Sequence, residues 1–384
     1  MKGIDVGKLE KELSALWAEE GRAQREGAQA SVTRACVLNL VAWVESAEQR
    51  AALDEVLGEV VERHPCRALL LVAERAATEE RLDAYVSMRC QLLQRGGKQI
   101  CGEEVTIEAG GPTVESLASA VAPLLVPDVP VFLWWRDLPH EDDRLFARLA
   151  SMSDRVVVDS AACDRPRDGL LRLARMLEAG RIRARLTDVN WGRLTSWRNL
   201  VASFWDVSSY REHLNRLSLV RISYVPPRVA PKEAAAQAWL LAGWLASRLG
   251  WEVEGRKEDE EGEGDVEGKA SKFVLKASDG RPVVVDLRAC DGPAECDGRV
   301  SALAFADEEA DAQFHVEYRP EMTKLETGAR LGGRLLAGRV LAYEARTEGR
   351  RLSAELDILS RDPVYEQAAR AAARLAEALP APPA

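Results

Sequence analysis

The sequence lacks the residue spacings that most catalytic and metal centres require. Only four histidines occur among 384 residues, and none has a second histidine or a cysteine at metal-ligand spacing. No Cys-x-x-Cys pair, Walker loop, Gly-x-Ser-x-Gly elbow or Gly-x-Gly-x-x-Gly fingerprint is found. These absences argue against an enzyme, and we expect neither a metal nor a cofactor.

Basic charge and long apolar runs are also scarce. The net charge is −10, so nucleic acid is not an expected partner, because binding phosphates requires a basic surface. The longest apolar runs, such as Val129–Trp135 and Ala238–Ala246, fall short of the roughly 20 residues that span a bilayer. The first residues lack the apolar stretch of a signal peptide. We therefore expect a cytoplasmic protein with no membrane contact and mostly free thiols.

What the sequence does contain is alternating strand and helix patterns. Buried strands are predicted at 36–44 and 67–73, and two alternating stretches, 84–93 and 99–108, predict a hairpin around Gly96-Gly97. Helices and strands then alternate as far as Asp159, which indicates βαβ units. We expect an α/β fold of two domains, each a mixed β-sheet flanked by helices, with the first domain at 1–164.

The second domain is expected at 165–384. It contains a long apolar helix at 231–249, several strands, a strand-like stretch at Leu352–Leu359 and a final helix. Residues 252–268 hold nine acidic residues, two basic residues and four glycines. Such a segment buries little apolar surface, so it predicts a mobile loop.

A tryptophan–arginine segment, Asn190–Asp206, is the first candidate binding surface. On a helical projection its apolar residues share one face, which is typical of a helix packed on a core. Tryptophan and arginine are also the residues that most often anchor interfaces. We predict that four of them contact a partner: Trp191, Arg193, Arg198 and Trp205.

Arginine is concentrated between Arg165 and Arg198, where nine arginines occur with no lysine and only three acids. Arginine makes planar, bidentate contacts to carboxylates and phosphates. Arg181, Arg183 and Arg185 alternate as if on one strand face. The stretch is a candidate surface for an acidic partner or for a sugar phosphate.

Two cysteine pairs are candidates for redox chemistry. Cys90 and Cys101 lie on the two arms of the predicted hairpin, and Cys290 and Cys296 flank a turn. Either pair could form a labile disulfide, although buried or idle thiols explain the same residues.

Several segments together resemble one protein family. They include HPCRALLLV (64–72), CGEEVTIEAGG (101–111), PDVPVFLWWRDLP (127–139) and TDVNWGRLTSWRNLVASFWD (187–206). A longer segment at 223–251 and RVVVDSA at 155–161 extend the likeness to about residues 1–360. The family is that of the glucose-6-phosphate dehydrogenase assembly protein OpcA.

The resemblance implies a partner protein with no catalytic residues of its own. Family members bind glucose-6-phosphate dehydrogenase, promote its assembly and raise its activity in the oxidative pentose phosphate pathway. In cyanobacterial members thioredoxin is associated with this activation, although the resemblance assigns no cysteine here to that role. The alternatives are an enzyme or sensor that binds a sugar phosphate at Arg165–Arg198, and a redox sensor that uses the cysteine pairs.

Overall fold

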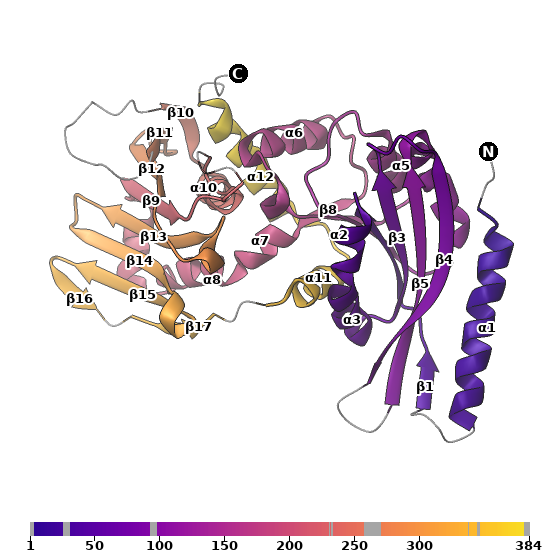
Figure 1. The fold of residues 1–384 in the computed structure, drawn as a ribbon. Coiled ribbons are helices and arrows are strands. Elements are labelled where there is room, and N and C mark those ends of the chain that lie inside the picture. The colour runs from indigo at the N-terminus through magenta and orange to yellow at the C-terminus, as the bar shows by residue number, and fades with distance from the viewer. Residues whose placement is uncertain are drawn as a thin grey trace. The chain divides into compact units, whose positions relative to one another are not determined.

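The computed structural model describes residues 4–25, 31–92, 98–229, 231, 233–256, 270–336, 338–343 and 346–379. They form two compact units (Figure 1), each a β-sheet flanked by helices, which confirms the predicted α/β class. Unit 1 comprises Met1–Asp159, Gly180–Val189 and Arg346–Arg361, and unit 2 comprises Ser160–Ala179, Asn190–Ala345 and Asp362–Ala384. The single boundary predicted at residue 164 differs from this division, because the chain returns twice to unit 1.

The sheet of unit 1 is mostly parallel. In the described residues its strand order is β4-β5-β3-β2-β6-β7-β8, and the short β1 pairs with the start of β5. All neighbouring strands run parallel except β4, which is antiparallel to β5. The strands are β1 (Ser31–Arg34), β2 (Leu38–Val44), β3 (Cys66–Glu74), β4 (Arg81–Leu92), β5 (Lys98–Gly110), β6 (Val131–Trp135), β7 (Arg155–Val158) and β8 (Arg185–Asp188).

Helices cover both faces of this sheet because its central strands are apolar on both sides. Every residue of β2 and β6 is buried, as expected for parallel strands enclosed by helices. Figure 1 shows α1 alongside β1 and β4. The helices of unit 1 are α1 (Val6–Arg25), α2 (Ala47–Ala51), α3 (Leu53–Arg63), α4 (Leu117–Val121), α5 (Arg144–Ser151) and α11 (Glu348–Leu356).

The stretch Leu352–Leu359 was predicted to be a strand, and this prediction is wrong. Most of the stretch lies in helix α11. Leu352 and Leu356 are four residues apart, so both point to the same side of a helix. Both are buried in the core that α3 forms against β2 and β3. The apolar residues of this segment therefore follow a helical period.

Unit 2 contains a nine-stranded sheet in the part of the chain that the structure describes. The order is β10-β11-β12-β9-β13-β14-β15-β16, and β17 also pairs with β15. Among the described strands of this sheet, only β9 and β12 run parallel to each other. The strands are β9 (Leu219–Tyr224), β10 (Glu252–Arg256), β11 (Ala270–Lys276), β12 (Pro282–Ala289), β13 (Val300–Asp307), β14 (Ala312–Arg319), β15 (Lys324–Leu331), β16 (Arg334–Leu336) and β17 (Val340–Ala342).

The predicted acidic loop was expected to begin at residue 252, but its first residues form strand β10. Glu252–Arg256 pair with β11, so these five residues belong to the sheet. Residues 257–268 of the predicted loop lie outside the described residues.

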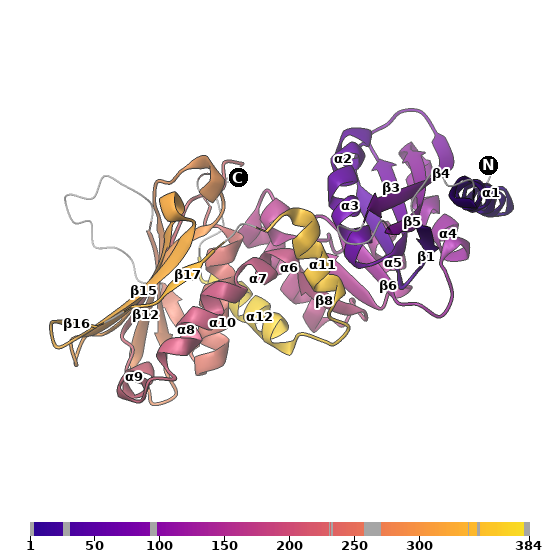
Figure 2. The ribbon, with the colours of Figure 1, turned by 90° about the horizontal axis from the view of Figure 1, so that it is seen from below.

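Helices cover one face of the unit 2 sheet (Figure 2). Phe204 of α8 packs on Phe314 of β14, and Trp239 of α10 packs on Phe273 of β11. The helices of unit 2 are α6 (Pro166–Glu178), α7 (Val189–Arg193), α8 (Thr195–Phe204), α9 (Ser208–Leu214), α10 (Ala236–Leu249) and α12 (Pro363–Glu377). Among the described residues, no helix has both the length and the apolar content to cross a bilayer.

Gly243 allows α10 and α12 to pack at close range. A β-carbon at this position would overlap the backbone oxygen of Ala368 and the backbone nitrogen of Ala372. The facing residues of α12 include the buried alanines Ala368, Ala369 and Ala372. Small side chains on both helices therefore set the distance between them.

We expect Gly243→Ala to destabilise the protein by about 1–3 kcal/mol, because backbone must move to admit the methyl group. The matched control is Gly21→Ala on α1, where nothing lies within 4 Å of the added carbon. That variant should gain about 0.5–1 kcal/mol from helix propensity. Urea-unfolding midpoints measure the stability of both variants. If Gly243→Ala is stabilised as much as Gly21→Ala, the close packing of α10 on α12 is contradicted.

Candidate functional site

Trp191 lies in the interior of unit 2. Its side chain is 2% exposed, and its indole Nε1 donates a hydrogen bond to Asp362 Oδ2 at 3.0 Å. The ring of Tyr365 lies 5.8 Å away, centroid to centroid. Asp362 also begins α12, because its Oδ1 accepts a hydrogen bond from the Tyr365 amide. The predicted role of Trp191 as a surface anchor does not fit this position.

Arg198 lies over the Trp191 ring. Its guanidinium carbon lies 3.4 Å from the ring centroid, a cation–π contact, and the side chain is half-buried. Arg193 is also half-buried, and its Nη1 lies 3.4 Å from Asn190 Oδ1. A partner could therefore reach parts of Arg193 and Arg198, while much of each side chain is already in contact with its own unit.

Asn190 extends this cluster into a buried polar network. Asn190 Nδ2 donates to Ser160 Oγ at 3.0 Å, and Asn190 Oδ1 accepts from Gln237 Nε2 at 2.9 Å. Gln237 Oε1 in turn accepts from the Val300 amide. The network joins α7, α10 and the start of β13, so it fixes the segment on which Trp191 lies.

Trp205, at the end of α8, is half-buried on the sheet of unit 2. Its ring makes edge contacts with Phe305 and Phe314, with centroids 6.3 Å and 5.0 Å away. Its backbone oxygen accepts a hydrogen bond from Arg211 Nε. Part of the ring stays accessible, so Trp205 retains the geometry that an interface residue needs.

Arg181, Arg183 and Arg185 are all exposed, and Ile182 between the first two is buried. Only Arg185 belongs to a strand, β8, whereas Arg181 and Arg183 precede it. Arg181 Nη1 lies 3.6 Å from Glu141 Oε2. These residues are in unit 1, whereas Arg193 and Arg198 are in unit 2.

Other arginines of the basic stretch have structural contacts in unit 2. Arg167 donates to the backbone oxygens of Ala376 and Leu379, near the carboxyl end of α12. Arg165 Nε pairs with Asp168 Oδ2 at 2.9 Å. The stretch is thus divided between two units, and part of its charge is used within the fold.

Cys90 and Cys101 are joined by a disulfide across β4 and β5, where the two residues are register partners. Cys101 is buried and Cys90 is half-buried. Attack by an external thiol would therefore meet the Cys90 sulfur more easily than the Cys101 sulfur.

Cys290 and Cys296 are free thiols in this structure. Cys290 Sγ lies 3.4 Å from the Tyr224 backbone oxygen, while Cys296 is buried. Burial raises the pKa of the Cys296 thiol, so it stays protonated near neutral pH and is a poor nucleophile. The sulfur chemistry of this pair stays a prediction.

An exposed apolar surface on unit 2 was not identified from the sequence. It lies at the edge of the sheet formed by β16 and β17, where Leu335 is 71% exposed and Val340 is 60% exposed, and Leu341 is also exposed. Exposed apolar residues on a sheet edge are typical of interaction surfaces. The only signal in the sequence was a pair of short apolar runs beside glycines.

The strand order of unit 1 is compatible with a nucleotide-binding site. From β5 to β8 the parallel order matches that of a doubly wound dinucleotide-binding sheet, whose ligand lies at the carboxyl ends of the strands corresponding to β2 and β6. A glycine-rich turn after β2 is needed so that the backbone can approach the pyrophosphate.

The residues after β2 do not fit that ligand. Glu45 and Ser46 follow the strand, and Ser46 Oγ accepts a hydrogen bond from the Gln49 amide, while Gln49 Oε1 accepts from the Glu45 amide. The amides of Glu45 and Gln49 are thus already paired, and the carboxylates of Glu45 and Glu48 would repel phosphate. Nearby, Trp43 of β2 and Trp135 of β6 are buried and stacked, with centroids 4.0 Å apart.

No cluster of metal-binding side chains occurs in the residues described either.

Comparison with protein families gives two adjoining matches. Residues 58–175 match the family described as glucose-6-phosphate dehydrogenase subunit N-terminal domain. Residues 184–369 match the corresponding C-terminal domain family. Together the two matches include most of the chain.

Curated relatives come from cyanobacteria and are named as OxPP cycle proteins, OpcA. The protein of Nostoc punctiforme is 35% identical over 198 residues, which cover 51% of this chain and 40% of that protein. The protein of Synechococcus elongatus is 29% identical, covering 67% of this chain and 55% of that protein. The matched region thus spans about half the length of these relatives.

Among solved structures, an oxidoreductase from Sinorhizobium meliloti is 12% identical, with a TM-score of 0.48. The match covers 90% of this chain and 96% of the oxidoreductase chain. A likeness this weak supports no conclusion about activity.

We expect Trp191→Phe to destabilise the protein by about 1.5–3 kcal/mol, because it removes a hydrogen bond to a carboxylate. Trp205→Phe is the matched control and should cost less, since a phenyl ring keeps part of its contact with Phe314. Urea-unfolding midpoints would give both values. An unchanged midpoint for Trp191→Phe would contradict its structural role.

Proposed function

The chain belongs to the OpcA family, and on that premise we propose that it is a non-enzymatic assembly factor and allosteric activator of glucose-6-phosphate dehydrogenase. The observation that carries the proposal is the family match over residues 58–175 and 184–369. The names of the curated relatives, which refer to the OxPP cycle, support the same pathway.

The lack of fit for a dinucleotide in unit 1 supports a role without catalysis. The dehydrogenase would supply the cofactor and the reacting groups, while this chain would supply a binding surface. Activation then requires tighter binding to the active conformation or oligomer than to the inactive one. A coupling of about 1–3 kcal/mol would change apparent affinity roughly 5- to 150-fold.

We propose that exposed arginines make the main polar contacts with the dehydrogenase. Arg181, Arg183 and Arg185 are accessible and can form bidentate contacts with carboxylates. Trp205 and the edges of Arg193 and Arg198 are further candidates on unit 2. The apolar edge of β16 and β17 offers surface that a partner could desolvate, whereas Trp191 acts within the fold.

A redox input through thioredoxin is part of the proposal, with the Cys90–Cys101 disulfide as its target. Reduction would free β4 from its covalent link to β5, and the sulfur of the half-buried Cys90 is the accessible point of attack.

The sugar-phosphate alternative gains no support from the arginine geometry. Several of these side chains hold helix ends or pair with acids of their own unit, and the stretch is divided between two units. Sugar-phosphate binding at Arg165–Arg198 is therefore the rival hypothesis.

The direct experiment mixes the purified chain, oxidised or reduced, with the dehydrogenase of the same organism. Mass by light scattering and dehydrogenase activity should change together, because assembly and activation share one interface. If mass, turnover and substrate affinity all stay the same in both redox states, the proposal fails.

The double variant Arg181→Glu/Arg183→Glu should weaken the complex by at least about tenfold, because it places like charges opposite each other at the interface, which costs several kcal/mol. Arg22→Glu on α1 is the matched control, because Arg22 is also an exposed arginine of unit 1. Equal affinities for the two variants, measured by titration of dehydrogenase activity, would exclude Arg181 and Arg183 from the interface.

A further inference from the structure

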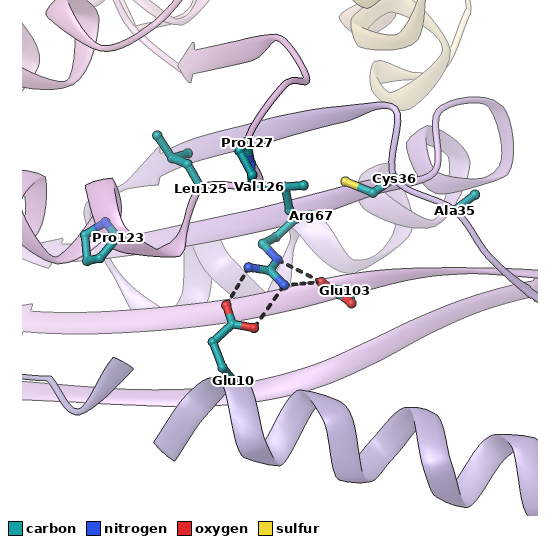
Figure 3. Close-up of a pocket in the computed structure, with 9 residues that line it drawn as sticks. All are labelled: Glu10, Ala35, Cys36, Arg67, Glu103, Pro123, Leu125, Val126 and Pro127. Carbon is teal, nitrogen blue, oxygen red and sulfur yellow. Dashed lines mark hydrogen bonds and ion pairs between the residues drawn. The ribbon is translucent and has the colours of Figure 1, made fainter. Parts of the chain in front are cut away.

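A pocket of about 480 Å³ lies at the amino-terminal end of the unit 1 sheet (Figure 3). Its walls come from helix α1, strands β3 and β5, the segment before β2 and the segment before β6. Glu10, Arg67 and Glu103 supply its charged groups, and the other lining residues are Ala35, Cys36, Pro123, Leu125, Val126 and Pro127. The pocket therefore combines small and apolar side chains with one cluster of charges gathered around Arg67.

Arg67 is nearly buried and holds two carboxylates (Figure 3). Its Nε and Nη2 lie 2.7 Å and 2.6 Å from Glu103 Oε2. Its Nη1 and Nη2 lie 2.6 Å and 3.4 Å from the two oxygens of Glu10. Burial alone would lower the pKa of Arg67, but the two carboxylates outweigh this effect and raise it.

The two carboxylates differ in how firmly they are held. Glu103 is 7% exposed, lies within strand β5 and also accepts a hydrogen bond from Trp17 Nε1. Glu10 is 41% exposed and lies on the surface of α1. Leu9 and Leu13 are buried and hold α1 in place, so the Glu10 side chain can turn to solvent while the helix stays docked.

The opposite wall is fixed before any ligand arrives. Asn39 is fully buried and makes two hydrogen bonds with Val126, donating to its oxygen and accepting from its amide at 2.9 Å and 2.8 Å. The Leu124 oxygen accepts a further hydrogen bond from Arg67 Nη1. Such preorganisation reduces the entropy lost on binding.

When Glu10 turns away, Arg67 and Glu103 remain as a neutral pair. The guanidinium then presents the N–H groups of Nη1 and Nη2 that the Glu10 carboxylate had occupied. A planar oxyanion is the group that an arginine fork binds best. A short aliphatic chain attached to it would bury its methylenes on the apolar wall.

We propose that this pocket binds a small-molecule carboxylate on a short aliphatic chain, which replaces the Glu10 carboxylate on Arg67. Glu10 is then the internal occupant of an otherwise complete site. This inference is independent of the proposed contact with the dehydrogenase, because it concerns a ligand of the isolated chain.

The test measures the melting temperature of the full chain against sodium butanoate, with sodium chloride keeping the ionic strength constant. A ligand that binds only the folded chain raises this temperature in a saturable way. Wild type should bind butanoate weakly but saturably, and Glu10→Ala should bind it about tenfold more tightly or better. The substitution removes the Glu10 carboxylate, an internal competitor that acts at millimolar effective concentration.

Two further variants control the experiment. Glu19→Ala removes another exposed carboxylate of α1 and should behave as wild type. Arg67→Lys keeps the charge but removes the planar fork, and it should lose butanoate binding. If Arg67→Lys does not fold, the comparison of Glu10→Ala with Glu19→Ala decides alone.

The proposal is overturned if Glu10→Ala binds butanoate no better than Glu19→Ala, or if sodium chloride alone reproduces the effect. Inorganic phosphate is the second probe. Tighter saturable binding of phosphate than of butanoate would also overturn the assignment of a carboxylate with an aliphatic chain.

Discussion

The hydrogen bond from the Trp191 indole to Asp362 connects two parts of unit 2 that are far apart in sequence. The two residues are 171 positions apart. Asp362 begins α12, α12 packs on α10 through the space left by Gly243, and α10 packs on the sheet through Trp239. Because Asp362 uses one oxygen for the helix start and the other for Trp191, loss of this contact would disturb both α12 and the polar network around Asn190.

The fold class and the hairpin could be predicted because they depend on local patterns. Strand–helix alternation requires only the period of apolar residues, and the β4–β5 pairing follows from two alternating stretches beside a glycine pair. The carboxylate that receives the Trp191 indole could not be predicted, since a helical projection shows which side chains share a face but not what lies opposite. Tryptophan beside arginine is typical of interfaces, and the same pair forms a cation–π contact inside a fold.

Other differences have local causes. Glu252–Arg256 is acidic and resembles the loop that follows, yet it gains backbone pairing from β11. Leu352–Leu359 is short and apolar, and such runs do not distinguish a strand from a buried helix. The Arg67 pocket was not predicted because its charged residues come from α1, β3 and β5, and no sequence spacing connects them.

Unit 1 shows that strand order alone does not determine activity. Its parallel order would suit a dinucleotide, but that site needs glycine and free amides after β2. This turn instead contains glutamate, and its Glu45 and Gln49 amides are already hydrogen-bonded. If the chain works through surfaces, as proposed, this edge is free to serve stability instead. Trp191 stabilises the fold, and we propose that the exposed arginines and the β16–β17 edge contact a partner.

The central claim is that this chain acts by binding a protein and has no nucleotide-dependent centre of its own. Titration of the isolated chain with NADPH, followed by nucleotide fluorescence, tests it most directly. The account predicts no saturable binding at concentrations where the dehydrogenase, as positive control, is saturated. Saturable binding of NADPH to the chain alone, abolished by substitution of residues after β2, would contradict it.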